Sequence, residues 1–531
     1  MRLPGRPTLR GLAAHSEIST EKHNRFSINN YGKPKTGKNM KSTDLTVKIK
    51  RMSDRSLFEC VLKDGSAVSA SDDSGIITRF KVDAPPSDSV MSSVMKLYET
   101  AGRAGMKIEA CPSESDNSVI WTPLRIGNLT AKNRFAVLPM EAADANPDGT
   151  PTESTVQRYR DYCRGGSGVV WIEAVSLDAP TRSRNNQLLL DVYDASSRRA
   201  WEKFIGDLKK EFPDTVIILQ YHHGGETVSA NASRKVSVKE LYGFGGDIID
   251  AGYIDSFIDR EVETARFLHE IGADGIDLKM CHGYLGSQIL RPYNDRDWKY
   301  GGSWENRSRF AFDPCERIRD MIHDRRFLLG ARVSMYDEMP GGQGHVGADS
   351  PYIDLSESIA LIKGMEARGC DFFGETIGNA SVYWKNMSPV KSCAANVYYH
   401  LTMAKVMKDN LRPETVVIGA GLSALGKGGE SALGGMSPEN EGLRAFAEKC
   451  ISTGGLDMIG LGRQAFADPY LPLKMQLGID DQIKWCKTCN MCSELELNMK
   501  HIGCVVYDGK YKELLKKTRA EGAKDLRNFT R

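Results

Sequence analysis

Four cysteines near the end of the chain are the strongest chemical signal in the sequence. Cys486, Cys489, Cys492 and Cys504 follow a C-x2-C-x2-C-x11-C pattern. Thiolates spaced this closely hold a metal, and the pattern alone allows a structural zinc ion or a [4Fe–4S] cubane. The other cysteines of the total of 12 are scattered, which is typical of reduced thiols and predicts a reducing, cytoplasmic location.

A second set of chemically capable residues follows short apolar runs in the middle of the chain. It combines carboxylates with basic, amide and phenolic side chains, which can bind ligands and exchange protons. If the apolar runs are parallel strands of a barrel, these residues meet at one end of it. The set consists of Glu141, Glu173, Gln220, Tyr221, His222, His223, Lys279, His282, Tyr284, Arg332, Glu375, Gly462 and Arg463.

The elements that must position these residues alternate between two kinds. Amphipathic stretches such as 196–212 and 257–272 separate apolar runs that read as strands buried on both faces. This alternation predicts an α/β protein with a (β/α)8 TIM barrel. An open doubly wound sheet would need a G-x-G-x-x-G turn after its first strand, and none is present. The expected strands are 134–140, 168–174, 215–221, 274–280, 327–334, 370–376, 415–421 and 456–462.

The rest of the chain predicts further segments around this barrel. Residues 1–43 are basic and lack periodicity, which indicates a disordered tail. Residues 44–116 read as a small α+β appendage with three strands and a helix over 89–105. The barrel then occupies 117–475, and a segment that carries the cysteine cluster occupies 476–531.

Charge and hydropathy exclude two classes of partner. The formal net charge is +2, so there is no electrostatic reason to expect nucleic acid. No apolar run approaches the roughly 18 residues that a membrane-spanning helix needs. We therefore expect a small-molecule substrate and neither a nucleic-acid nor a membrane partner, with a homo-oligomer left open.

Several motifs resemble the Old Yellow Enzyme family of FMN flavoproteins. The first is "QYHHGGE", which follows the third expected strand. Two more, "ARVS" and "LGRQAFADPYLPLK", come later in the chain. The block "DGIDLKMCHGYLGSQILRPYNDRDWKYGGSWENRSRF" (274–310) is the most specific of them. The resemblance covers about residues 118–510. With the cysteine tail, it points to the iron–sulfur branch that includes 2,4-dienoyl-CoA reductase and trimethylamine dehydrogenase.

The resemblance implies an FMN site at the open end of the barrel. Pro139 and Met140 would line the flavin, and Ala174 would lie beside it. Gln220 would hydrogen-bond the pyrimidine edge of the isoalloxazine. Arg332 would face the N1/C2=O end, where a fixed guanidinium stabilises the negative charge of the reduced flavin.

The same resemblance assigns the FMN phosphate and the metal. Gly421, Gly462 and Arg463 would hold the phosphate through backbone N–H groups and one charge-assisted contact. The four cysteines, Cys486, Cys489, Cys492 and Cys504, would hold a [4Fe–4S] cluster near the FMN. The alternative is a different class of protein, in which the cysteines hold a structural zinc ion and the barrel is a binding module without redox chemistry.

The substrate face departs from the family pattern. Lys279 and His282 stand where the family has His-x-x-His or His-x-x-Asn, and Tyr284 matches its proton-donor tyrosine. The resemblance thus implies an ene-reductase that transfers hydride from FMN N5 and a proton from Tyr284 to an enoate, enone or enoyl thioester. Three roles are open for Lys279: to stabilise an enolate oxygen, to bind a substrate carboxylate, or to neutralise an acid such as Glu173 or Glu375.

An oxidative function is the main alternative. The C-x2-C-x2-C spacing favours an amine dehydrogenase or demethylase of the trimethylamine dehydrogenase type. That branch has a tyrosine where Lys279 stands, and a buried lysine cation would repel an ammonium substrate. After Cys504 only 27 residues follow, too few for a dinucleotide domain, so we expect a separate ferredoxin or flavoprotein subunit as electron partner.

Overall fold

The computed structural model describes the part of the chain on which the site depends. It describes residues 45–52, 55–62, 79–81, 118–229, 232–238, 244–345, 347, 352–380, 387–390, 395–427, 442–476 and 480–522. The expected N-terminal tail and the expected helix over 89–105 lie outside these residues. The expected appendage strands fall on β1 (Leu45–Met52), β2 (Arg55–Leu62) and β3 (Arg79–Lys81), of which β1 and β2 form an antiparallel pair.

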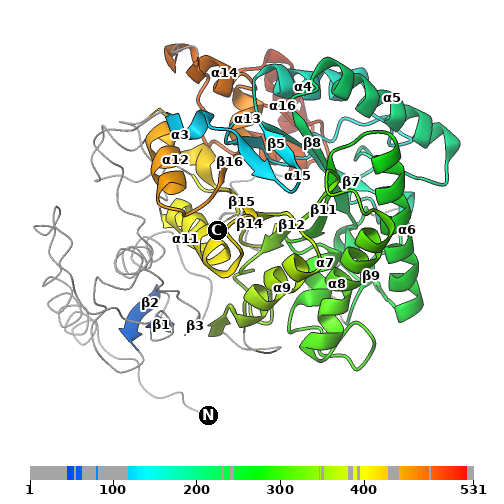
Figure 1. Ribbon diagram of the computed structural model, residues 1–531, viewed down its shortest axis with the longest axis vertical. Helices are drawn as coiled ribbons and strands as arrows, with labels where there is room; N and C mark the ends of the chain where they lie inside the picture. Colours follow the sequence, from blue (N-terminus) through cyan, green and yellow to red (C-terminus); the bar gives the residue numbers. More distant parts are fainter. Residues whose placement is uncertain are drawn as a thin grey trace, which may run out of the picture.

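A closed parallel barrel of eight strands forms the centre of the molecule (Figure 1). Each expected strand contains one strand of this barrel or overlaps it, so the predicted (β/α)8 architecture is confirmed. The strands are β6 (Phe135–Val137), β7 (Val169–Ser176), β8 (Val216–His222), β11 (Gly275–Met280), β12 (Leu328–Ser334), β14 (Phe372–Thr376), β15 (Val416–Gly419) and β16 (Met458–Leu461).

Helices surround the barrel on its outside (Figure 1). Their buried faces and the outward residues of the strands form one large apolar core. Asp194 and Ser303 cap α5 and α8 by accepting backbone N–H groups, which fixes where these helices begin. The surrounding helices are α4 (Glu153–Arg164), α5 (Ala195–Glu211), α6 (Ala251–Glu270), α8 (Trp304–Met321), α9 (Ser356–Ala367), α11 (Ala395–Asn410) and α12 (Leu443–Ser452).

A second, smaller core fills the barrel interior. Its members include Trp171 of β7 and Phe372 of β14, whose rings meet edge to face at 5.4 Å. The hairpin of β4 (Leu124–Ile126) and β5 (Leu129–Ala131) contributes Ile126 and Ala131 to this core. The hairpin thus closes one end of the barrel with apolar side chains, and among the described residues the other end is the one open to a ligand.

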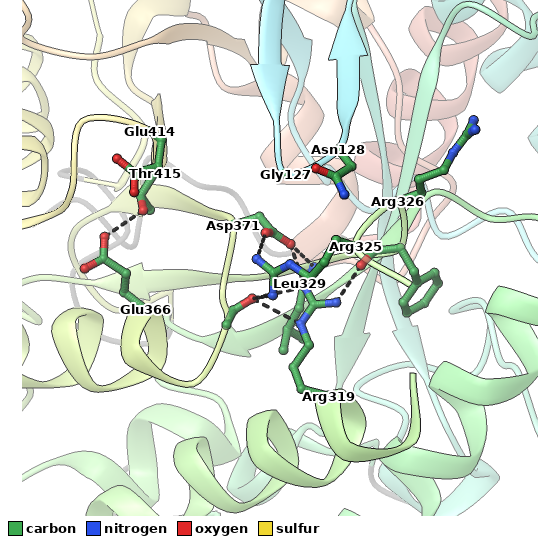
Figure 2. A network of polar contacts seen from close by, with 12 residues as sticks. Gly127, Asn128, Arg319, Arg325, Arg326, Leu329, Glu366, Asp371, Glu414 and Thr415 are labelled. Atoms are coloured by element: carbon green, nitrogen blue, oxygen red, sulfur yellow. Dashed lines mark hydrogen bonds and ion pairs between the residues drawn. The ribbon is translucent and has the colours of Figure 1, made fainter. Parts of the chain in front are cut away.

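A clasp of arginines and one aspartate ties the closed end together (Figure 2). Asp371, just before β14, accepts hydrogen bonds from Arg319 Nη2 at 2.6 Å, from the Leu329 amide at 3.0 Å and from Arg325. Arg319 and Arg325 also donate to the Gly369 carbonyl at 3.1 Å. A surface hollow of about 540 Å³ is lined by both arginines, but they are already bonded to protein atoms, and the hollow lies away from the open end.

The cysteine segment follows the barrel. Helices α13 (Arg463–Ala467) and α14 (Leu471–Gln476) lead from β16 into it, and α15 (Met491–Leu497) and α16 (Gly509–Ala520) form its regular part. Leu495, Val505, Tyr511 and Leu515 build a small core of its own. No described helix combines the length and the apolar character required to cross a bilayer.

Candidate active site

Gln220, Asp277 and Arg332 lie on three adjacent strands at the open end of the barrel. Register places Gln220 of β8 opposite Asp277 of β11. The Asp277 carboxylate accepts a hydrogen bond from Gln220 Nε2 and one from the Arg332 backbone N–H at 2.5 Å. Burial raises the pKa of Asp277 to about 7, and these two bonds oppose that rise.

Two atoms of this group are left for a ligand. Gln220 Oε1 and Arg332 Nε are buried without a hydrogen-bond partner in the described part of the chain. A buried polar atom that stays unpaired costs about 1–3 kcal/mol, so such atoms indicate a ligand that completes them. An acceptor and a cationic donor near the same carboxylate suit the pyrimidine edge of a flavin, so these residues fit the FMN that the resemblance implies.

The glycines expected at the phosphate end follow two adjacent strands, β15 and β16. Gly421 has φ +77°, and a Cβ there would lie 2.6 Å from the His400 ring. A Cβ on Gly462 would lie 3.3 Å from Met140 Sδ, so the ends of β6 and β16 are in contact. Only glycine permits this close approach at position 421. The assignment of a phosphate to these turns stays a prediction.

Arg463 makes contacts that the sequence did not suggest. Its guanidinium donates to the side chain of Asn490, between two of the cysteines, and to the Pro389 carbonyl. It therefore connects the end of β16 to the cysteine loop, and its expected phosphate contact is not tested. Pro139 and Ala174 are buried at the ends of their runs, and the Ala174 carbonyl accepts a bond from Gln187 at 3.1 Å.

Lys279 and Tyr284 lie side by side at the open end of the barrel. Lys279 Nζ lies 4.2 Å from the centre of the Tyr284 ring, and His222 meets the same ring edge-on at 4.6 Å. Burial lowers the pKa of Lys279, and the nearby Glu141 carboxylate opposes this. Neither Lys279 Nζ nor the Tyr284 hydroxyl makes a hydrogen bond to a described residue. A buried ammonium and a phenol without such bonds are available to a ligand.

His282 is held so that one ring nitrogen stays available. Its backbone is left-handed with φ +66°, and its amide donates to Ser334 Oγ at 3.1 Å. Its Nε2 lies 2.8 Å from Thr376 Oγ1, whereas Nδ1 makes no hydrogen bond to a described residue. Burial lowers the pKa of His282, which keeps the ring neutral.

The acid beside Lys279 is Glu141. Its Oε1 lies 3.8 Å from Lys279 Nζ. The two acids that the sequence suggested have other partners: Glu173 pairs with Arg158 at 3.1 Å, and Glu375 lies 3.0 Å from His400. Lys279 therefore does not neutralise Glu173 or Glu375, because each of these carboxylates has a partner on a surrounding helix, α4 or α11.

The four cysteines lie in the cysteine segment, Cys492 on α15 and the other three outside its helices, without forming a compact metal-binding group. Within the described residues, no three metal-ligating side chains converge tightly enough to hold an ion. Burial raises the pKa of Cys492 to about 12, and Cys486 and Cys489 raise it further. The Thr488 amide donates to Cys486 Sγ at 3.4 Å. Clustered thiols with amide donors have the chemistry that an iron–sulfur centre needs.

Three residues of this region were missed by sequence reasoning. Arg184, in the loop after β7, lies between Glu141 at 3.1 Å and Glu496 of α15 at 3.2 Å. Asp277 was missed because it lies inside a strand and not at its end. The sequence does mark Asp277, as a charged residue within an otherwise apolar run. The contact between Arg184 and Glu496 could not be predicted, because 312 positions separate them.

Comparison with known proteins yields one family match. The sequence profile of the NADH:flavin oxidoreductase / NADH oxidase family matches residues 119–408. An NADH oxidase of Thermoanaerobacter brockii is 25% identical over an alignment of 381 residues, and the match covers 69% of this chain and 52% of that protein. An N,N-dimethylglycine/sarcosine dehydrogenase of Chromohalobacter salexigens is 23% identical, over 73% of this chain and 52% of the relative.

A solved structure shows the same fold. A 2-naphthoyl-CoA reductase in complex with 2-naphthoyl-CoA superposes with a TM-score of 0.62 at 20% identity, covering 75% of this chain and 58% of that one. The chain spans about half the length of the curated relatives it matches.

Proposed function

Because the chain belongs to the NADH:flavin oxidoreductase / NADH oxidase family, we propose that it binds FMN and reduces an activated C=C bond. The substrate class is an enoate, enone or enoyl thioester. One observation carries the proposal: a buried ammonium, Lys279, and a phenol, Tyr284, lie side by side without hydrogen bonds to described residues. Such a pair supplies charge stabilisation and a proton, the two things that reduction of an alkene next to a carbonyl needs from a protein.

The chain's own residues would act on the substrate as follows. Lys279 Nζ and His282 Nδ1 would donate to the carbonyl oxygen and draw electron density towards it. FMN, when bound and reduced, supplies the hydride. Tyr284 would give its hydroxyl proton to the α-carbon and regain one from solvent, so the alkene gains two electrons and two hydrogens in total. Burial raises the pKa of Tyr284 well above its ordinary value, which keeps the phenol protonated until this step.

The proposal can be tested by reducing the purified protein anaerobically and adding cinnamate, a cyclic enone or an enoyl thioester. We expect one of these to reoxidise the flavin and to be recovered with a saturated bond. Tyr284→Phe should slow that turnover roughly 100-fold, within the range of general acid catalysis. The matched control is Tyr470→Phe, because Tyr470 donates to Asp161 at 2.8 Å away from the open end. Turnover that survives Tyr284→Phe would rule the mechanism out.

Two observations favour a second candidate function, the oxidation of an amine. The C-x2-C-x2-C spacing resembles that of amine dehydrogenases, and one relative is an N,N-dimethylglycine/sarcosine dehydrogenase. Against it, Lys279 would repel an ammonium group, and Glu141 is shared between Lys279 and Arg184. An amine substrate would bleach the oxidised flavin without added reductant, whereas an ene-reductase needs a reductant first.

We also propose that Cys486, Cys489, Cys492 and Cys504 hold a [4Fe–4S] cluster. Support comes from their C-x2-C-x2-C-x11-C spacing and from the amide that donates to Cys486 Sγ at 3.4 Å. Iron and sulfide assays should give about four of each per chain. Zinc without iron would contradict the cluster.

A cluster would exchange electrons with a separate protein, and we propose a ferredoxin-like carrier or a flavoprotein subunit. The support is that Cys489 is exposed, which puts one edge of the cysteine loop at the surface. Stopped-flow mixing with reduced ferredoxin, NADH or NADPH would show which of them reduces the flavin. Faster reduction by a pyridine nucleotide alone would contradict the need for a carrier.

A further inference from the structure

A line of alternating charges runs from the cysteine helix to Tyr284. Arg184 Nη2 lies 3.2 Å from Glu496 Oε1, and Arg184 Nη1 donates to the Glu496 carbonyl at 3.4 Å. On its other side, Arg184 Nε lies 3.1 Å from Glu141 Oε2. Glu141 Oε1 then lies 3.8 Å from Lys279 Nζ, which stands over the Tyr284 ring.

The Glu141 carboxylate lies closer to Arg184 than to the ammonium of Lys279. At 3.1 Å the carboxylate forms an ion pair with Arg184 Nε that lacks hydrogen-bond geometry, whereas 3.8 Å to Lys279 is a longer ion pair. The N–H donors of Lys279 stay available as a result, although a carboxylate is its neighbour.

We propose that Arg184 and Glu496 are positioning residues of the substrate site, and that helix α15 of the cysteine segment completes this site. Arg184 restrains Glu141 so that Lys279 can donate to the substrate, and Glu496 anchors Arg184. The proposal rests on the proposed function for the identity of the substrate, but not for the restraint on Lys279.

Attachment of the cysteine segment does not explain this arrangement. The segment is fastened to the barrel elsewhere: the Cys486 amide donates to Gln464 Oε1 at 2.8 Å, and the Ile502 amide donates to the Ala142 carbonyl at 2.7 Å. Burying Arg184, which is 7% exposed, between two acids costs desolvation that apolar residues would avoid. Glu496 remains 39% exposed, so it borders open space beside these charges.

The first test measures Lys279 directly, in the FMN-loaded protein, by acetylation with acetic anhydride and mass spectrometry. In Arg184→Met, Glu141 is free to close onto Lys279, and we expect labelling of Lys279 to fall several-fold. Adding Glu141→Gln to Arg184→Met removes the attracting charge and should restore the labelling. A role confined to stability would not be rescued by a second substitution at Glu141.

The second test measures turnover of the alkene. We expect Arg184→Met to lower kcat/KM roughly 10- to 100-fold, the size of effect that misplacement of a catalytic group produces. Glu496→Gln should lower it less, and Arg184→Lys should keep part of it. The matched control is Glu494→Gln: Glu494 lies on the same helix but pairs with Arg519 at 2.6 Å and not with Arg184, so in folded protein kcat/KM should stay within about twofold.

The two tests separate the possible failures. Unchanged Lys279 labelling in Arg184→Met would overturn the inference whatever the substrate is. An equal loss of kcat/KM in Glu494→Gln would overturn it as well, because the effect would then belong to the helix as a whole. The expected labelling pattern without alkene turnover by the unaltered protein would overturn the proposed function and leave the restraint on Lys279 supported.

Discussion

Asp277 and Lys279 lie on the same face of β11, because residues two apart on a strand point the same way. Asp277 is satisfied by Gln220 and by the Arg332 backbone, so it serves the structure of the barrel end. Lys279 lies one layer nearer the open end and makes no hydrogen bond to a described residue. The two charged residues of one strand therefore have different tasks, and hydrogen bonding distinguishes them.

Arg332 should decide how tightly the protein binds FMN. Its Nε is buried and unpaired, so Arg332→Met removes a cationic donor that a ligand would satisfy. A hydrogen bond to a charged group contributes about 2 kcal/mol, which corresponds to roughly 30-fold weaker binding. Titration of the apoprotein with FMN, followed by quenching of flavin fluorescence, measures this. Arg309→Met on the exposed face of α8 should leave the affinity unchanged, and an equal loss there would contradict the assignment.

Asp337 should make stability depend on pH. It is 1% exposed, accepts the Gln343 amide at 3.1 Å, and burial raises its pKa to about 7. Because the folded pKa exceeds the unfolded value of about 3.9, its contribution to stability is complete below about pH 4 and is lost as the pH rises through about 7.

Asp337→Asn should therefore reduce the loss of unfolding free energy between about pH 5 and pH 8. One pKa unit corresponds to about 1.4 kcal/mol, so the change should be a few kcal/mol. Urea unfolding at each pH measures it. Asp214→Asn is the control, because Asp214 has a side chain that is 63% exposed. Parallel pH profiles for the unaltered protein and Asp337→Asn would contradict the prediction.

Prediction from the sequence worked for residues that share a motif and failed for residues that meet only in space. The 279–284 stretch and Gln220 belong to contiguous motifs, and the structure places Lys279 against the Tyr284 ring. The partner of Lys279 could not be read from the sequence, because Glu141 comes from another strand end. Distances between loops depend on the whole fold, and residue types carry no signal for them.

At the scale of elements, all eight barrel strands were predictable because both faces of each are buried. Their lengths were not: the run 134–140 yields only β6 (Phe135–Val137), since Pro139 lacks an N–H for pairing. The β4–β5 hairpin that closes the barrel was missed, because its strands of three residues are too short to show a period.

The clasp at the closed end should contribute strongly to stability. Asp371 neutralises Arg319 and Arg325 and joins them to the Leu329 amide (Figure 2). Asp371→Asn leaves Arg319, which is 11% exposed, without its charge partner. Breaking a buried pair costs about 3–5 kcal/mol, so the urea midpoint should fall clearly.

The control for the clasp is Glu414→Gln, since Glu414 is 71% exposed and lies 3.7 Å from Arg412. Such a surface pair contributes less than about 1 kcal/mol, so its loss should barely move the midpoint. FMN affinity should be the same in both variants, because the clasp lies at the closed end. Weaker FMN binding in folded Asp371→Asn would show that the two ends of the barrel are coupled.

At the scale of the whole molecule, the cysteine segment is joined to the barrel at several points. Arg463 reaches Asn490, Gln464 accepts the Cys486 amide, and Arg184 pairs with Glu496. The sequence predicted a segment that carries a metal, and it gave no indication that this segment also borders the substrate face. That relation arises because α15 packs beside the loop after β7.

Loss of the cluster should therefore loosen the substrate face. Cys492 and Glu496 are four residues apart on α15, so they share one side of the helix. In Cys492→Ser, which should lose iron, α15 is less restrained and its hold on Arg184 weakens. Amide hydrogens in the loop after β7, residues 182–187, should exchange roughly 10-fold faster by mass spectrometry, as expected for a loss of about 1.4 kcal/mol of local stability. The control is Cys450→Ser in α12, which should change neither the iron content nor the exchange rates in this loop. Unchanged exchange rates in iron-free Cys492→Ser would show that the cysteine segment and the substrate face behave independently.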